Sequence, residues 1–413
     1  MREAIMRLRV WATLLLALIL VGSIGPVAAQ EAPSSADLGE AIFFDEALSL
    51  NGNQSCASCH DPDWGWTGPD SAINDGGSVY EGSIAGRFGD RKPPSSAYAT
   101  VSPIFHVDKK GTFVGGNFWD GRATGEVLGN PAADQAQGPF LNPAEQALPD
   151  SACVVYRVCN PSYPVSFEAV WGEEACDIAW PGDIVAACAA EDTTVNLSAG
   201  DRDKSNAAYN QIALSIAAFE DSTNTFSSRF DTGKLTKEEQ RGYALFRGKA
   251  GCKACHPANG PDALFTDFTY DNLGIPVNPA NPAFIADKTF RDAGLGLFLE
   301  ARGYEDDVYE DEWGKVKVPT LRNVDLRPAG DDIKAFGHNG YFKSLEGIVH
   351  FYNTRDVKDT CPDLYTEAQA LAANCWPEPE VADNVNTDEL GDLGLTAEEE
   401  AAIVAFLRTL SDE

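Results

Sequence analysis

The sequence predicts a mainly α-helical protein built from two similar domains with long ordered loops. The pentapeptide pattern C-x-x-C-H occurs twice, at residues 56–60 and 252–256, and a helix-like segment precedes each copy. The stretches 61–118 and 257–330 are rich in Gly, Pro, Asn and Asp and carry few strand patterns. A repeated helix-plus-motif unit with loops between the copies therefore favours an α class over a sheet-based one.

The repeated pentapeptide is the attachment sequence of a c-type haem. Its two thiols add to the porphyrin vinyl groups, and the adjacent histidine ligates the iron. Zinc binding and dithiol redox chemistry are the alternatives, but a zinc site would close its ligands into one tetrahedron, which two distant copies do not suggest. We therefore expect two covalently bound haem c groups in two cytochrome c-like haem domains. The residues concerned are Cys56, Cys59 and His60 in the first copy and Cys252, Cys255 and His256 in the second.

Capping patterns and periodicity place the helices. Ser35 is the expected cap of the first helix. Thr236 with Glu239, and Thr396 with Glu399, form capping boxes before apolar-periodic segments. A further segment has apolar residues at helical spacing. The four helices are expected at 35–44, 205–220, 237–248 and 396–410.

The first 29 residues have the features of a secretory signal. A positive start containing Arg2 precedes an apolar run at 10–21, and small residues at 27–29 form a cleavage site. A transmembrane anchor is the alternative, but the apolar run is too short to span a bilayer comfortably. We expect the mature protein to be exported to the periplasm without a membrane anchor.

A polar link near 222–234 divides the rest of the chain. Asp221 and the residues that follow it are polar and begin this link. We expect domains at 30–224 and 225–413, one around each haem motif.

The remaining six cysteines predict disulfides, because an even number in an exported protein is typical of structural bridges. Cys361 and Cys375 are close in sequence and are expected to pair. Four others lie in one stretch and allow three connectivities; a catalytic dithiol is the functional alternative. These four are Cys153, Cys159, Cys176 and Cys188.

Charge and methionine content limit the partners and the iron ligands. The formal net charge of −32 argues against nucleic acid and anionic membranes and is compatible with a basic electron-transfer partner. Met1 and Met6 are the only methionines, and both lie in the expected signal. A methionine sixth ligand to haem iron is therefore excluded in the mature chain.

Beyond the haem motifs, ordered segments resemble the bacterial di-haem cytochrome c peroxidase and MauG family. The resemblance runs in order over nearly the whole mature chain. The segments are Phe118–Ala123 (FWDGRA), Gln135–Glu145 (QAQGPFLNPAE), Val318–Val324 (VPTLRNV) and His338–Gly340 (HNG).

This resemblance implies roles for individual residues. Trp119 matches an electron bridge between the haems; a buried core indole is the alternative. Gln135, Pro139 and Glu145 match the pocket where peroxide meets the first haem, with Glu145 as the acid–base group. Asn142–Glu145 could instead begin a helix. Arg322 is implied to contact haem.

The chain also departs from the family pattern. The family's removable histidine ligand to the first haem corresponds to Gly76, which implies that this iron is open to peroxide. The family's calcium site uses an Asn after an Arg, whereas Arg91 is followed by Lys92, so calcium is doubtful. His106 lies outside the matching loop and is expected to be a packed loop histidine.

The sixth ligand of the second haem is expected to be Tyr352, fourteen residues after His338, where MauG has a tyrosine. A tyrosinate ligand stabilises oxidised iron. His350, His338, and Tyr352 as an ordinary packed aromatic remain the alternatives.

Together these features predict a periplasmic di-haem oxidoreductase of the cytochrome c peroxidase type. Hydrogen peroxide would react at the first haem, and electrons would come through the second haem from a redox protein or from a protein substrate. The alternative is a non-enzymatic di-haem electron carrier, which would have two six-coordinate irons.

Overall fold

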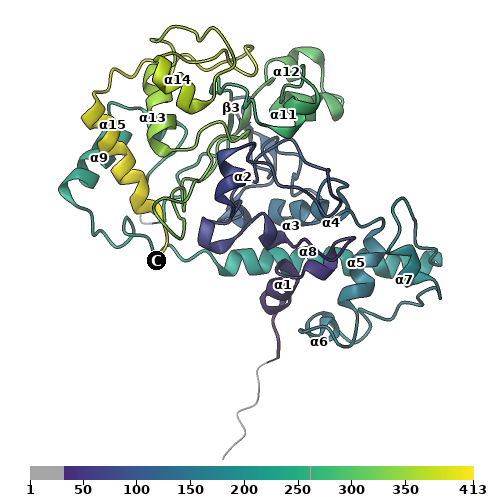
Figure 1. Cartoon of the computed structure of the whole chain (residues 1–413). Helices are drawn as coiled ribbons and strands as arrows, with labels where there is room; N and C mark the ends of the chain where they lie inside the picture. Colours follow the sequence, from purple (N-terminus) through teal and green to yellow (C-terminus); the bar gives the residue numbers. More distant parts are fainter. Residues whose placement is uncertain (1–31, 261) are drawn as a thin grey trace, which may run out of the picture. The chain divides into compact units, whose positions relative to one another are not determined.

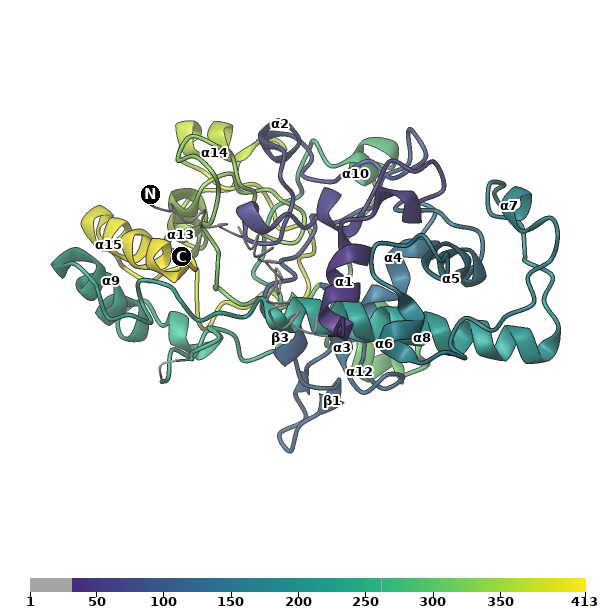
Figure 2. The same ribbon diagram turned by 90° about the horizontal axis from the view of Figure 1, so that it is seen from below.

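Two packed helix pairs organise the protein, as seen in a computed structural model that describes residues 32–260 and 262–413. Helix α1 (Ser35–Phe43) packs against α8 (Ala199–Ser222), and α9 (Lys237–Arg247) packs against α15 (Ala397–Leu407) (Figure 1). The perpendicular view also shows each pair side by side (Figure 2). The structure is mainly helical with few short strands, so the predicted fold class is confirmed.

A glycine allows close approach in each pair. A Cβ atom on Gly39 of α1 would lie 1.9 Å from the Ser215 carbonyl oxygen of α8. A Cβ atom on Gly242 of α9 would lie 1.8 Å from the Ala402 carbonyl oxygen of α15. The Cβ atom of Phe219 in α8 would lie 2.9 Å from the Cβ added to Gly39, and the Cβ atom of Phe406 in α15 would lie 2.9 Å from the Cβ added to Gly242. Each phenylalanine comes four residues after the carbonyl that is contacted. The two helix pairs are thus equivalent, and Ser215 corresponds to Ala402.

Capping residues fix where these helices begin. Thr236 and Thr396 form the predicted capping boxes. The cap of α1 is Ser34 rather than the expected Ser35, because the Ser34 hydroxyl accepts from the backbone N–H of Asp37. Helix α8 starts earlier than the expected residue 205, since Ser198 caps a polar first turn that has no apolar periodicity.

The other elements are short and lie within long loops. The strands pair antiparallel, β1 (His106–Val107) with β2 (Phe113–Val114) and β3 (Tyr270–Asp271) with β4 (Val316–Lys317). The remaining α-helices are α2 (Ser71–Asp75), α3 (Pro131–Ala136), α4 (Gly138–Leu141), α5 (Ser151–Val158), α6 (Phe167–Trp171), α7 (Ile184–Ala187), α10 (Pro282–Ala286), α11 (Gly294–Ala301), α12 (Asp306–Glu310), α13 (Leu345–Thr354) and α14 (Glu367–Ala373). Single 3-10 turns occur at η1 (Glu46–Leu48), η2 (Cys56–Ser58), η3 (Pro62–Trp64), η4 (Ala99–Val101), η5 (Cys252–Ala254) and η6 (Arg408–Leu410).

Two principal hydrophobic clusters fill the compact unit Pro33–Glu413. The buried members of the first cluster run from Leu38 to Phe219, and those of the second from Phe246 to Leu410. The division of the chain near 222–234 remains a prediction, and these clusters draw on opposite sides of it.

Three disulfides staple the loops. Cys361 pairs with Cys375, which confirms the expectation from sequence. Of the three connectivities open to the other four cysteines, the structure forms Cys153–Cys188 and Cys159–Cys176. The bridges close loops with sequence separations of 35 and 17 around α5, α6 and α7.

The expected secretory signal at 1–29 lies outside the described residues. Within the described part of the chain, no helix combines the length and the apolar character needed to cross a membrane.

Candidate functional site

Each haem motif lies in the wall of a large cavity. Cys56, Cys59 and His60 line the first cavity, of about 240 Å³. Their equivalents in the second motif line another of about 200 Å³. Each motif begins with a 3-10 turn, η2 or η5, and in each the histidine N–H donates to the carbonyl of the first cysteine. The repeated sequence therefore produces a repeated local structure.

Both motif histidines are held in the same tautomer. The Nδ1 atom of His60 lies 3.1 Å from the Trp66 carbonyl oxygen, and that of His256 lies 2.7 Å from the Phe265 carbonyl oxygen. A carbonyl can only accept, so Nδ1 carries the proton and Nε2 remains free to bind a metal. Burial lowers the pKa of His60 to about 4 and also lowers that of His256. Both imidazoles are therefore neutral, the state that coordinates iron.

Three predicted residues converge on the first cavity from neighbouring segments. Gln135 lies on α3, Pro139 on α4, and Glu145 in the turn after α4, and all three line the cavity. The Asn142 side-chain amide donates to Glu145 Oε1 at 2.7 Å. Burial raises the pKa of Glu145, although Arg122 and the Asn142 hydrogen bond oppose that shift.

The alternative helix-start interpretation of Asn142–Glu145 is wrong, because α4 ends at Leu141 and a turn follows. Glu145 is thus placed by turn geometry rather than by a helix dipole.

The two cavities share a wall that contains Trp119. This indole is 7% exposed and lines both cavities. Its Nε1–H donates to the Lys92 carbonyl oxygen at 2.8 Å, and its own carbonyl accepts from the Lys317 N–H at 2.8 Å. Besides Trp119, the residues common to both linings are Lys92, Ser95, Lys317, Val318, Pro319 and Thr320. Trp119 is both a buried indole and the aromatic group between the cavities.

Tyr352 lies on α13 and lines the second cavity. Burial raises the pKa of its phenol, so a cation in the cavity would be needed to stabilise the phenolate. His338 also lines this cavity, with Nε2 3.0 Å from Glu380. His350 does not line it; this histidine pairs instead with Glu400 and contacts Lys358.

Arg322 lines the second cavity but its guanidinium is already paired. The side chain is fully buried and donates to Asp231 Oδ1 at 2.8 Å and to the Ala263 carbonyl oxygen at 2.8 Å. Its aliphatic stem is therefore the part free to contact a cavity occupant.

His106 differs from expectation. The sequence predicts a packed loop histidine, but His106 lies exposed on strand β1, with its Nδ1 2.8 Å from the Ile104 carbonyl oxygen. Gly76 ends α2 and does not line the first cavity.

Sequence reasoning missed several ionisable groups in the cavity linings, among them Lys334 in the second cavity. Glu220 on α8 lines the first cavity, and Lys92 and Lys317 line both. Glu220 carried one signal, since it lies four residues after Ile216 on the apolar face of the predicted helix. Lys92 lies in a loop and Lys317 on the two-residue strand β4, and no periodicity distinguishes either lysine.

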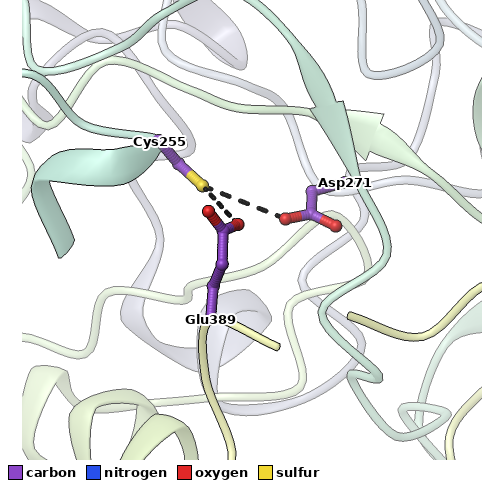
Figure 3. A group of neighbouring side chains, drawn as sticks. All are labelled: Cys255, Asp271 and Glu389. Carbon is purple, nitrogen blue, oxygen red and sulfur yellow. Dashed lines mark hydrogen bonds between the residues drawn. The ribbon is translucent and has the colours of Figure 1, made fainter. Parts of the chain in front are cut away.

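One group of potential metal ligands occurs among the described residues: Cys255, Asp271 and Glu389 (Figure 3). The Cys255 sulfur lies 3.9 Å from Asp271 Oδ2 and 3.6 Å from Glu389 Oε2. Because haem attachment would use this sulfur, the two carboxylates would remain, and both accept from the Asn386 amide. The group is therefore better described as an acidic edge beside the second haem motif than as a calcium site.

Known proteins resemble this chain over most of its length. A family model described as di-haem cytochrome c peroxidase matches residues 33–240. The methylamine utilization protein MauG of Paracoccus denitrificans is 34% identical over 398 residues, covering 91% of this chain and 88% of that protein. The cytochrome-c peroxidase IdrP2 of a Pseudomonas species is 27% identical, covering 94% of this chain and 84% of that protein. The crystal structure of the diheme peroxidase BthA from Burkholderia thailandensis is similar with a TM-score of 0.68 and 29% identity, covering 92% of this chain and 86% of that chain.

Proposed function

Because the chain belongs to the di-haem cytochrome c peroxidase family, an enzyme family with two haem c groups, we propose a specific division of labour between its two cavities. Hydrogen peroxide reacts in the first cavity, and electrons arrive through the second from a protein partner in the periplasm. Each haem, when bound, supplies an iron that changes oxidation state. The positions of two residues that match the family pattern carry this proposal: Glu145 lines the first cavity and Tyr352 lines the second.

The two motifs hold the cofactors. Cys56 and Cys59 attach the first haem and Cys252 and Cys255 the second, while His60 and His256 present a neutral Nε2 to the iron. The hydrogen bond from each Nδ1 to a backbone carbonyl fixes the ring orientation. Domains 30–224 and 225–413 are then the peroxidatic and the electron-transfer halves.

Glu145 moves protons in the first cavity. Its buried carboxyl has a raised pKa, so it can accept the proton from one peroxide oxygen and deliver it to the departing oxygen. The Asn142 amide holds the carboxyl in place. Gln135 orients peroxide by hydrogen bonding, and Pro139 shapes the same side of the cavity.

The second cavity and the shared wall connect the reaction to its reductant. Tyr352 ligates the second iron, and Trp119 provides the aromatic path between the cavities. The absence of methionine from residues 7–413 leaves an oxygen or nitrogen ligand. A tyrosinate oxygen would stabilise the higher oxidation states of the iron, which favours a centre that holds an oxidising equivalent over an easy electron entry port. This chemistry favours oxidation of a protein side chain, as expected for a MauG-like enzyme, over turnover with a small redox protein. Membership of a peroxidase family does not favour the non-enzymatic carrier.

Replacing Glu145 tests the proposal. Glu145→Gln should slow peroxide consumption by ~10²–10⁴-fold, the typical effect of losing acid–base assistance. Glu168→Gln, which removes an exposed carboxyl on α6, is the matched control and should consume peroxide normally. Normal consumption by the Glu145 variant would exclude its proton-transfer role.

A further inference from the structure

The lysine and arginine side chains that line the two cavities differ in how they are neutralised. Each of the three arginines forms an ion pair with an aspartate: Arg91 with Asp292 at 2.6 Å, Arg122 with Asp120 at 2.7 Å, and Arg322 with Asp231 at 2.5 Å. The lysines are Lys92, Lys317 and Lys334, and none forms an ion pair with a described carboxylate. The lysines therefore determine the uncompensated charge of the cavity walls.

Two of these lysines use all three of their N–H donors. Lys334 Nζ donates to the carbonyl oxygens of Trp64, Asn323 and Leu326 at 2.8, 2.8 and 3.0 Å. Lys317 Nζ donates to Ser102 Oγ at 2.6 Å, to Asn117 Oδ1 at 3.2 Å and to the Gly116 carbonyl oxygen. Neither ammonium has an N–H left for a ligand.

One N–H of the Lys92 ammonium has no acceptor among the described residues. Its Nζ donates to Thr67 Oγ1 and to the Pro93 carbonyl oxygen, each at 2.9 Å, and meets no third acceptor among the described residues. The residue is 7% exposed and lines both cavities. A buried ammonium on two neutral oxygens is costly unless a negative group faces it. Burial accordingly lowers the pKa of Lys92 to about 7 in the absence of such a group.

We propose that the Lys92 ammonium binds a haem carboxylate at the wall shared by the two cavities and holds a positive charge between the two haems. The inference rests on the proposed attachment of haem in both cavities. Haem c carries two carboxylates, and Lys92 is the lining cation with both a free N–H and no carboxylate of its own. The Lys92 carbonyl also accepts the Trp119 indole N–H, so one residue positions the indole and the charge together.

This ammonium takes the place that a bound metal cation would otherwise have. Thr67 Oγ1 and the Pro93 carbonyl oxygen are the hard oxygen ligands that calcium prefers, and Lys92 occupies them. The carboxylates Asp120 and Asp292 nearby are taken by Arg91. The protein should therefore keep its inter-haem charge without calcium.

The reduction potentials of the two haems test the charge. A fixed positive charge favours the reduced iron, so Lys92→Met should lower both midpoint potentials in a spectroelectrochemical titration of the haem-loaded protein. We expect at least a tenfold change in each reduction equilibrium, ~59 mV for a one-electron couple. Lys92→Arg keeps the charge and should restore the potentials toward those of the unmodified protein.

Lys343→Met is the matched control. Its ammonium is half-buried and is also bound to neutral oxygens, but Lys343 lines neither cavity. The midpoint potentials of both haems should stay unchanged in Lys343→Met. Unchanged potentials in Lys92→Met, a shift in one haem alone, or an equal shift in both methionine variants would overturn the inference.

Metal analysis of the purified holoprotein gives an independent test that needs no variant. We expect calcium well below one per chain and no change of either potential after treatment with a calcium chelator. Stoichiometric calcium whose removal shifts the potentials would overturn the inference. Failure of the proposed function would be seen differently, as a haem-loaded protein that does not consume peroxide.

Discussion

Replacing Glu220 with leucine should remove a pH dependence from the stability of the protein. Glu220 is 4% exposed on α8, lines the first cavity, and burial raises its pKa from 4.5 to about 8. The equivalence of the helix pairs, in which Ser215 corresponds to Ala402, aligns Glu220 with Leu407 of α15. Leu407 lines the second cavity. The protein itself thus shows that leucine fits this helix position.

The magnitude follows from the pKa difference between folded and unfolded chains. The folded pKa lies above the unfolded one, so folding favours the protonated carboxyl. Stability is full below the unfolded pKa of 4.5 and is lost as the pH rises toward the folded pKa of about 8. At 1.36 kcal/mol per pKa unit, the loss between about pH 5 and about pH 8 is roughly 3 kcal/mol.

Denaturant unfolding of the haem-loaded protein at these two pH values measures this loss. The change in the free energy of unfolding between the two pH values is compared between the unmodified protein and Glu220→Leu. The contributions of the other titrating groups cancel in this comparison. Glu220→Gln should behave like Glu220→Leu, because both remove the ionisation. If the unmodified protein and both variants lose the same free energy between the two pH values, the carboxyl is not titrating as a buried acid, and the assignment is wrong.

Two further predictions concern the second cavity and the helix pairs. Tyr352→Phe should change the absorption and paramagnetic resonance spectra of the second haem. Tyr341→Phe, which changes a buried tyrosine outside both linings, should leave these spectra unchanged. If the Tyr352→Phe spectra match those of the unmodified protein, Tyr352 is not the ligand. Gly242→Ala should lower the free energy of unfolding by ~1–3 kcal/mol or more in a denaturant titration, because the added methyl group meets the Ala402 carbonyl. Gly200→Ala on α8, where a Cβ atom meets nothing within 4 Å, should instead stabilise by up to ~1 kcal/mol; equal effects of the two changes would contradict the close helix contact.

Local signals in the sequence were sufficient for the capping boxes of α9 and α15 and for the haem motifs. A capping box uses residues three apart, so Thr236 with Glu239 could be recognised without knowing the fold. The beginning of α8 could not, because its first turn is polar and its cap, Ser198, lacks the matching apolar run. The pairing Cys361–Cys375 followed from proximity in sequence, whereas four cysteines in one stretch needed the folded loops to select a connectivity.

The charged groups of the cavities depend on contacts between distant segments. Lys92 becomes significant only because Trp119 and the 317–320 segment complete the same wall. Its spare N–H can be recognised only after every acceptor around it has been counted. No spacing rule in the sequence contains that information.

The internal repeat explains how one helix arrangement can serve two different chemistries. Equivalent glycines bring α1 onto α8 and α9 onto α15, so both cavities have the same backbone frame. Within that frame the side chains diverge, with Glu220 in the first cavity where Leu407 stands in the second. A carboxyl is not required for the packing of this helix pair, since leucine packs at the equivalent place. The packing of the helix pair therefore does not explain the Glu220 carboxyl, and we infer that this carboxyl serves the chemistry of the first cavity.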